Sequence, residues 1–180
     1  MLWLKAEDFY YFKLLLSFGL SEEYDEWLNS SLESEAQLSD IVLQLSLCGS
    51  DKNKTISVLH HYCEKTEIDE RIVCDKLRGF LKDEYHSKRL DKEQTVLYMY
   101  KFATAHSAIN DLNIDIWGDM IYMDDYYQLA KDGTILWENF DNVFLNYLND
   151  GIAIDSNLLW FPKTKQKSTI LSRFKKFFKK

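Results

Sequence analysis

The sequence predicts an all-α fold: a single domain of about eight antiparallel helices, arranged as stacked hairpins in a bundle or a short helical-repeat-like array. Three observations support this. The 180 residues include one proline and six glycines, and apolar residues recur at spacings of three and four, the period of a helix. Strand-like alternation of apolar and polar residues is almost absent. Short polar joints separate the helical segments, which makes sequential helices antiparallel neighbours.

The first four helices are expected to form two hairpins. Their predicted spans are 6–18, 22–32, 35–48 and 52–65. Gly19 and Gly49 supply left-handed ends, while Ser21 and Asp51 cap the helices that follow. Acidic residues in the first turn of the second helix meet the positive end of its dipole. The positions predicted to be buried are Phe9, Phe12, Leu15, Leu16, Tyr24, Trp27, Leu28, Leu32, Leu38, Ile41, Val42, Leu45, Ile56, Leu59, His60 and Cys63.

Two longer helices follow, over 70–86 and 91–108. Asp69 is the expected cap of the first, and Asp91 begins the second. Their apolar stripes predict burial of Ile72, Val73, Leu77, Phe80, Leu81, Val96, Leu97, Tyr100 and Ala103.

The rest of the chain is more aromatic and more acidic. The predicted elements are helices over 120–131 and 135–149 and an extended segment over 152–161. Asp119 is expected to cap the first helix, and Gly133 and Gly151 to end the two helices. Residues 158–161 are too apolar to stay in water, so they should dock on the body. The predicted buried positions are Met120, Met123, Tyr127, Ala130, Leu136, Phe140, Phe144, Tyr147 and Leu148.

The net charge of -7 is unevenly distributed along the chain. Residues 1–162 carry a formal charge of -15, whereas residues 163–180 contain eight basic residues and no acidic one. We therefore expect an acidic helical domain over 1–162 and a basic tail over 163–180. An acidic body repels nucleic acid and attracts basic partners, although such charge also serves solubility alone.

The basic tail has the pattern of a short amphipathic helix. Its apolar residues are Ile170, Leu171, Phe174, Phe177 and Phe178. Three roles fit this pattern: contact with an anionic membrane surface, docking in a groove of a partner, and folding back on the acidic body of the chain itself.

No catalytic motif or phosphate-binding glycine loop is present, so the sequence predicts neither an enzyme nor a cofactor. His60 and Cys63 have metal-ligand spacing, but a second ligand pair is missing and Cys74 falls at a core position, so no metal site is predicted. Cys48, Cys63 and Cys74 are few and odd in number, which suits reduced thiols better than disulfides; together with an acidic start without a leader pattern they predict a cytoplasmic protein. No apolar run is long enough to span a membrane.

One acidic segment interleaves aspartates with aromatic residues. Its members are Asp111, Asp115, Trp117, Asp119, Tyr122, Asp124, Asp125 and Tyr126. Steering charge combined with aromatic anchors is typical of a protein-binding surface. A solvated acidic face with buried aromatics, or a carboxylate metal site, are the alternatives.

The acidic segment 111–125, with Trp117 and Tyr122, and the acidic residues 22–26 give the chain a character that resembles bacterial immunity proteins of contact-dependent inhibition and other polymorphic-toxin systems. The resemblance implies a cytoplasmic protein that neutralises a basic toxin domain, often a nuclease, by covering its functional surface without chemistry. The alternative is a helical scaffold or adaptor whose basic tail contacts a membrane or a partner.

Overall fold

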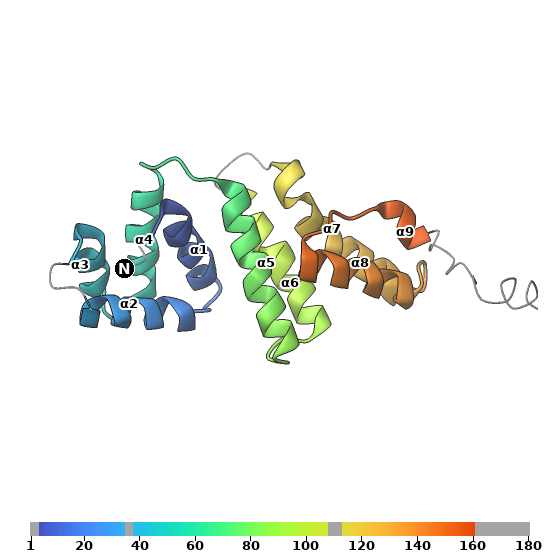
Figure 1. The fold of residues 1–180 in the computed structure, drawn as a ribbon, viewed down its shortest axis with the longest axis horizontal. Coiled ribbons are helices and arrows are strands. Elements are labelled where there is room, and N and C mark those ends of the chain that lie inside the picture. Colours follow the sequence, from blue (N-terminus) through green and yellow to red (C-terminus); the bar gives the residue numbers. More distant parts are fainter. Residues whose placement is uncertain (1–3, 35–37, 108–112, 161–180) are drawn as a thin grey trace, which may run out of the picture. The chain divides into compact units, whose positions relative to one another are not determined.

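The computed structural model describes residues 4–34, 38–107 and 113–160, and all the regular secondary structure in these ranges is helical, as predicted (Figure 1). The helices are α1 (Ala6–Ser17), α2 (Glu22–Ser34), α3 (Asp40–Ser46), α4 (Lys52–Cys63), α5 (Glu70–His86), α6 (Lys92–Ser107), α7 (Ile114–Lys131), α8 (Trp137–Asp150) and α9 (Ser156–Trp160). In the described ranges no helix is both long enough and apolar enough to cross a bilayer. The predicted basic tail, 163–180, lies outside them.

The chain divides into two compact units, Met1–Asp125 and Tyr126–Lys180, where the sequence pattern predicts one helical domain through residue 162. The boundary falls inside α7, which begins in the first unit and ends in the second. Domain boundaries are usually recognised from exposed linkers rich in proline, glycine or polar residues. The boundary between these two units lies in a continuous helix and carries no such signal.

Helix α1 forms the centre of the first unit. It contacts α2, α4, α5 and α6, and every residue from Phe9 to Leu16 is buried. The sequence pattern predicted burial of four of these residues, because an amphipathic helix buries only one face. A helix that is surrounded must bury its whole circumference. Consequently Lys13 is carried into the interior, where only 3% of its surface is exposed.

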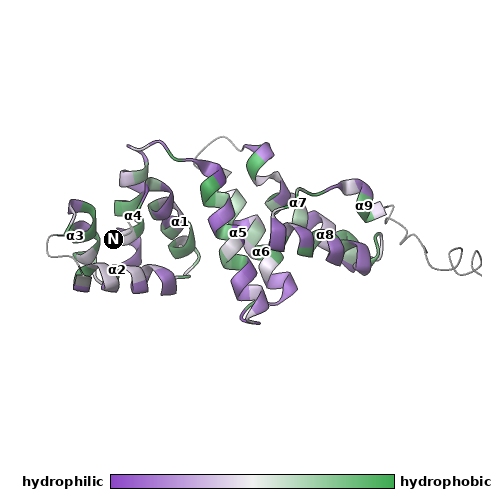
Figure 2. Ribbon diagram, in the orientation of Figure 1, coloured by the Kyte–Doolittle hydropathy of each residue, from purple (hydrophilic) through white to green (hydrophobic). Residues whose placement is uncertain are grey.

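Helices α5 and α6 pack against each other, and Figure 2 shows hydrophobic and hydrophilic residues alternating along α5, as in an amphipathic helix. The buried stripe of α6 differs from the prediction, because it follows Val96, Met99, Ala103 and His106. This stripe is rotated relative to the expected one. Five residues predicted to be buried are exposed: Leu32, Ile72, Leu97, Tyr100 and Leu136.

Most predicted helix ends are confirmed by local geometry. The Asp51 carboxylate accepts a hydrogen bond from the Lys54 amide at 3.0 Å, and the Asp69 carboxylate accepts one from the Arg71 amide at 3.0 Å. The glycines expected to end helices have the left-handed conformation that favours glycine: Gly19, Gly49, Gly133 and Gly151. These ends are therefore set by nearby residues alone.

The start of α7 differs from the prediction. Asp119 is not a cap, because the helix begins at Ile114 and Asp119 lies inside it. Asn113 takes the capping role: its side-chain oxygen accepts a hydrogen bond from the Asp115 amide at 3.2 Å, and its carbonyl accepts one from the Trp117 amide at 2.9 Å. Gly118 also lies inside the helix.

The segment predicted to be extended over 152–161 also differs, because it contains the short helix α9. The Asp155 carboxylate accepts a hydrogen bond from the Asn157 amide at 3.0 Å and so starts the turn. Leu159 is buried, and its carbonyl accepts a hydrogen bond from the Asn139 side chain of α8 at 2.9 Å. The apolar end of the segment thus docks on α8 within the second unit.

Candidate functional site

A groove of about 780 Å³ lies in the first unit, between the start of α2, the preceding turn and the end of α5. Five of its lining residues carry carboxylates and one carries a guanidinium group. The lining comprises Gly19, Leu20, Ser21, Glu22, Glu23, Asp25, Glu26, Asn29, Phe80, Glu84 and Arg89. We call it the acidic groove.

The α2 wall of the acidic groove holds four carboxylates because of where the chain turns. Gly19 adopts a left-handed conformation, which ends α1 and allows α2 to begin at Glu22. Carboxylates in the first turn of α2 are stabilised by the helix dipole. No lysine or arginine of the described ranges forms an ion pair with Glu22, Asp25 or Glu26, and all three side chains are exposed. This wall therefore presents its negative charge to solvent.

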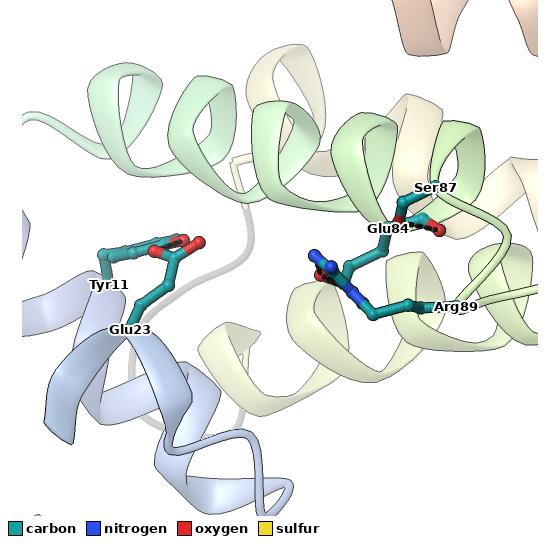
Figure 3. Close-up of polar contacts among 5 residues, drawn as sticks. All are labelled: Tyr11, Glu23, Glu84, Ser87 and Arg89. Atoms are coloured by element: carbon teal, nitrogen blue, oxygen red, sulfur yellow. Dashed lines mark hydrogen bonds and ion pairs between the residues drawn. The ribbon is translucent and has the colours of Figure 1, made fainter. Parts of the chain in front are cut away.

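Glu23 is fixed by a residue from α1. The Tyr11 hydroxyl donates a hydrogen bond of 2.6 Å to the Glu23 carboxylate (Figure 3). Burial and then this hydrogen bond raise the pKa of Tyr11, so the hydroxyl keeps its proton. Glu23 is thus held in place by a neutral donor.

The opposite wall carries an ion pair. The Arg89 Nε lies 3.0 and 2.9 Å from the two carboxylate oxygens of Glu84 (Figure 3). The Glu84 main-chain carbonyl accepts hydrogen bonds from the Ser87 hydroxyl at 3.1 Å and from the Arg89 amide at 3.0 Å, which closes the turn after α5. Since Arg89 neutralises Glu84, the unbalanced charge of the groove lies on α2. The Glu84–Arg89 pair shows how a carboxylate of the acidic groove binds a guanidinium group.

The second acidic region is the one that the sequence analysis selected, on α7. Asp115 and Asp125 are exposed, and Tyr122 exposes 42% of its surface. Asp115, Asp119 and Tyr122 are four and three residues apart within one helix, so they share a face. We call these residues, with Asp125 beside them, the acidic face of α7.

The other predicted residues of this region are placed differently. Asp111 lies outside the described residues. Asp124 is half-buried and, by helical periodicity, lies on the opposite side of α7 from Asp115. Tyr126 is half-buried and belongs to the second compact unit. The structure therefore brings only part of the predicted set onto one face.

Trp117 is not a surface anchor, because none of its surface is exposed. Its indole Nε1 donates a hydrogen bond of 3.1 Å to the Glu70 carboxylate, and its ring stacks on His106 with centroids 4.6 Å apart. Met120 and Met123 follow it at helical spacing and are also buried. Trp117 thus belongs to the core stripe of α7, where its indole nitrogen finds the partner that a buried tryptophan requires.

The structure also shows whether side chains that can bind a metal ion lie close together. In the described ranges, no three His, Cys, Asp or Glu side chains come together as a metal-ligand group. His60 lies 3.2 Å from Glu64, and the Cys74 thiol lies 3.5 Å from the Ile116 carbonyl. His60 and Cys74 therefore have structural partners, and Cys63 is buried.

One buried constellation was not found from the sequence. The Tyr10 hydroxyl, the His106 imidazole and the Glu70 carboxylate follow one another at 2.9 and 3.2 Å, the order of a nucleophile, a base and an orienting acid. Tyr10 and His106 are 96 residues apart, so no local motif links them. Since both are buried, a substrate has no access to the hydroxyl in this structure.

Comparisons with protein-family models, with curated proteins and with solved structures find no match to this chain. The function of this chain is therefore inferred from its residues and their contacts.

Proposed function

We propose that this protein is an immunity-type inhibitor that binds a basic toxin domain in the cytoplasm and covers its functional surface. The observation that carries the proposal is the acidic groove: about 780 Å³, five carboxylates, one guanidinium group and a negative wall whose Glu22, Asp25 and Glu26 form no ion pair with a described lysine or arginine. The proposal includes no chemical step in the inhibitor, because occlusion alone blocks a toxin.

Charge is the first element of the proposed mechanism. The acidic residues of the body create a negative potential that attracts a basic domain before any contact forms. Steering of this kind raises association rates above the ~10^5 to 10^6 per molar per second of uncharged docking. Fast capture matters for an inhibitor, since the toxin acts until it is bound.

The groove supplies the specific contacts. Glu23 is already oriented by Tyr11, so its side chain loses little conformational entropy when a guanidinium group of the partner binds it. Glu22, Asp25 and Glu26 are exposed around it and can receive further lysine or arginine side chains. Phe80 is a half-buried aromatic residue of the lining and offers a stacking surface for a guanidinium.

The acidic face of α7 is a second contact region in this proposal. Asp115, Asp119 and Tyr122 combine charge with one exposed aromatic ring, a composition typical of interfaces. Two regions give the proposal two separable tests, one for each set of residues.

The partner is first identified by affinity purification of the tagged full chain from its host, with low-salt and then high-salt washes and mass spectrometry. The proposal expects a stoichiometric basic protein that the high-salt wash weakens. Recovery of lipid-associated proteins instead would support the scaffold alternative and contradict the inhibitor function.

The surface is then located with charge-reversal pairs. Glu22→Lys with Asp25→Lys tests the groove, and Asp115→Lys with Asp125→Lys, both exposed, tests the acidic face of α7. Glu67→Lys with Asp132→Lys changes the net charge equally at exposed positions outside both regions. We expect the groove pair to weaken partner binding at least tenfold more than the control. Equal effects of the groove and control pairs would place the interface elsewhere.

A further inference from the structure

A buried polar cluster joins four helices of the first unit. It consists of Tyr10 from α1, Glu70 from α5, His106 from α6 and Trp117 from the first turns of α7. Only 1% of the His106 surface is exposed, and Trp117 is fully buried. The cluster thus connects helices that are distant in sequence through one imidazole ring and one carboxylate.

The geometry fits a neutral His106. The Tyr10 oxygen lies 2.9 Å from Nδ1, and the Glu70 Oε2 lies 3.2 Å from Nε2. Since a carboxylate only accepts hydrogen bonds, we assign the imidazole proton to Nε2, facing Glu70, and let the Tyr10 hydroxyl donate to Nδ1. In this tautomer Nδ1 accepts from Tyr10, whereas Nε2 lies within ion-pair distance of Glu70 but makes no hydrogen bond with the described residues.

The Glu70 carboxylate links His106 to Trp117. Its Oε2 faces both the His106 ring nitrogen and the Trp117 indole nitrogen, the latter at 3.1 Å. Glu70 is the first residue of α5, where the helix dipole favours a carboxylate, and its side chain is partly solvated. Glu70 therefore places one carboxylate oxygen between His106 and Trp117.

Lys13 adds a positive charge beside the cluster. Its ammonium group lies 4.1 Å from the centroid of the Tyr10 ring and has no hydrogen-bond acceptor among the described residues. The groups that face it from α4 are Cys63 and Glu64. Burial lowers the pKa of His106, Glu70 opposes this, and Lys13 adds to the lowering.

A proton on His106 disturbs this arrangement in two ways. Nδ1 becomes a donor, so the Tyr10 hydroxyl must turn and its proton loses this buried acceptor. The interior also gains a second cation near Lys13. The first effect removes the Tyr10–His106 hydrogen bond, and the second adds repulsion from Lys13 at the ring that stacks on Trp117.

We propose that Tyr10, His106, Glu70 and Trp117 form an acid-sensitive latch, and that protonation of His106 releases the first turns of α7 from α5 and α6. These turns carry Asp115 and Asp119, so acidification loosens the acidic face of α7. The inference is independent of the proposed function, because its test uses the full chain without any partner.

The test is nuclear magnetic resonance of the full chain between pH 7.5 and pH 5.0. The protection factor of the Trp117 indole N–H reports the latch, and the ¹⁵N shifts of the His106 ring report its proton. We expect the protection factor to fall at least tenfold, with the same midpoint as the His106 titration. An indole that stays protected after His106 has titrated would overturn the proposal.

Substitutions move the midpoint in opposite directions. Glu70→Gln removes the charge that attracts the proton and lowers the midpoint by about one pH unit, whereas Tyr10→Phe removes the hydroxyl that stabilises the neutral ring and raises it. His60→Gln with His61→Gln alters exposed histidines of α4 and leaves the midpoint unchanged. The proposal fails if both cluster variants shift the midpoint in one direction, or if the α4 variant shifts it equally.

Discussion

Two neighbouring tyrosines of α1 reach two carboxylates in very different settings. Tyr11 donates to Glu23 on the exposed wall of the acidic groove, whereas Tyr10 leads through His106 to Glu70 in the buried cluster. The groups are similar, but their exposure differs. An exposed carboxylate keeps its water and remains available to a partner, while the half-buried Glu70 carboxylate faces ring nitrogens of its own chain. The comparison separates the surface available for binding from the residues that maintain the fold.

The largest expected effect is on the buried side of the comparison. Trp117→Ala removes a fully buried indole and its hydrogen bond to Glu70, so we expect a loss of about 3–5 kcal/mol in the free energy of unfolding. Trp160→Ala is the matched control, since Trp160 is 49% exposed. Urea unfolding followed by circular dichroism measures both, and equal losses would remove Trp117 from the core.

The two tyrosines themselves give the sharpest comparison. Tyr10→Phe leaves the His106 Nδ1 without its donor in a buried site and should cost about 2 kcal/mol of stability. Tyr11→Phe should cost less than about 1 kcal/mol, because water can replace the hydroxyl at Glu23. Chemical denaturation of the two variants measures the difference. A larger loss for Tyr11→Phe would reverse our ranking of the two sites.

Lys13 is a charge on the buried side that lacks a hydrogen-bond acceptor in the described structure. Lys13→Met keeps the length and apolar stem of the side chain and removes the ammonium group. We expect a gain of about 1–2 kcal/mol in stability, less than the full cost of a buried charge, since the Tyr10 ring attracts the cation. A higher melting temperature is the expected result. Lys65→Met, at an exposed position, is the control and should change little.

The smallest effect is the dependence of stability on pH. The pKa of His106 is lowered in the folded state, mainly by burial, relative to about 6.5 in an unfolded chain. The contribution of neutral His106 to the free energy of unfolding is therefore fully present above pH 6.5, and it is lost as the pH falls through the pKa of the folded state. We expect His106→Gln to reduce the fall in unfolding free energy between pH 7.5 and pH 5.5 by about 1 kcal/mol. Urea titrations at the two pH values measure this; an unchanged slope would show that other groups set it.

Local features of the fold could be predicted from the sequence. Asp51 and Asp69 cap their helices, and Gly19 and Gly133 end theirs, because the partners of each lie within a few residues. The start of α7 was missed because Asn113 and Asp119 are both residue types that cap helices, and the sequence pattern favoured Asp119. Local patterns thus define helix ends unless two signals compete.

The candidate sites could be predicted only in part. The acidic residues of α2 are adjacent in sequence, but Glu84 and Arg89 come from a distant hairpin, and only folding places them in the same groove. Trp117 was expected at the surface because its neighbours are acidic. Its partner Glu70 is 47 residues away, so the sequence contains no nearby signal of its burial.

The association rate of the purified partner, measured at several salt concentrations, tests the central claim most directly. We predict that the rate for the native chain falls steeply with salt, and that Glu22→Lys with Asp25→Lys slows association at least tenfold at low salt and flattens that dependence. The charge-matched pair, Glu67→Lys with Asp132→Lys, should retain most of the rate. Identical rates and salt dependences for the native chain and the groove pair would contradict a role of the acidic groove in binding.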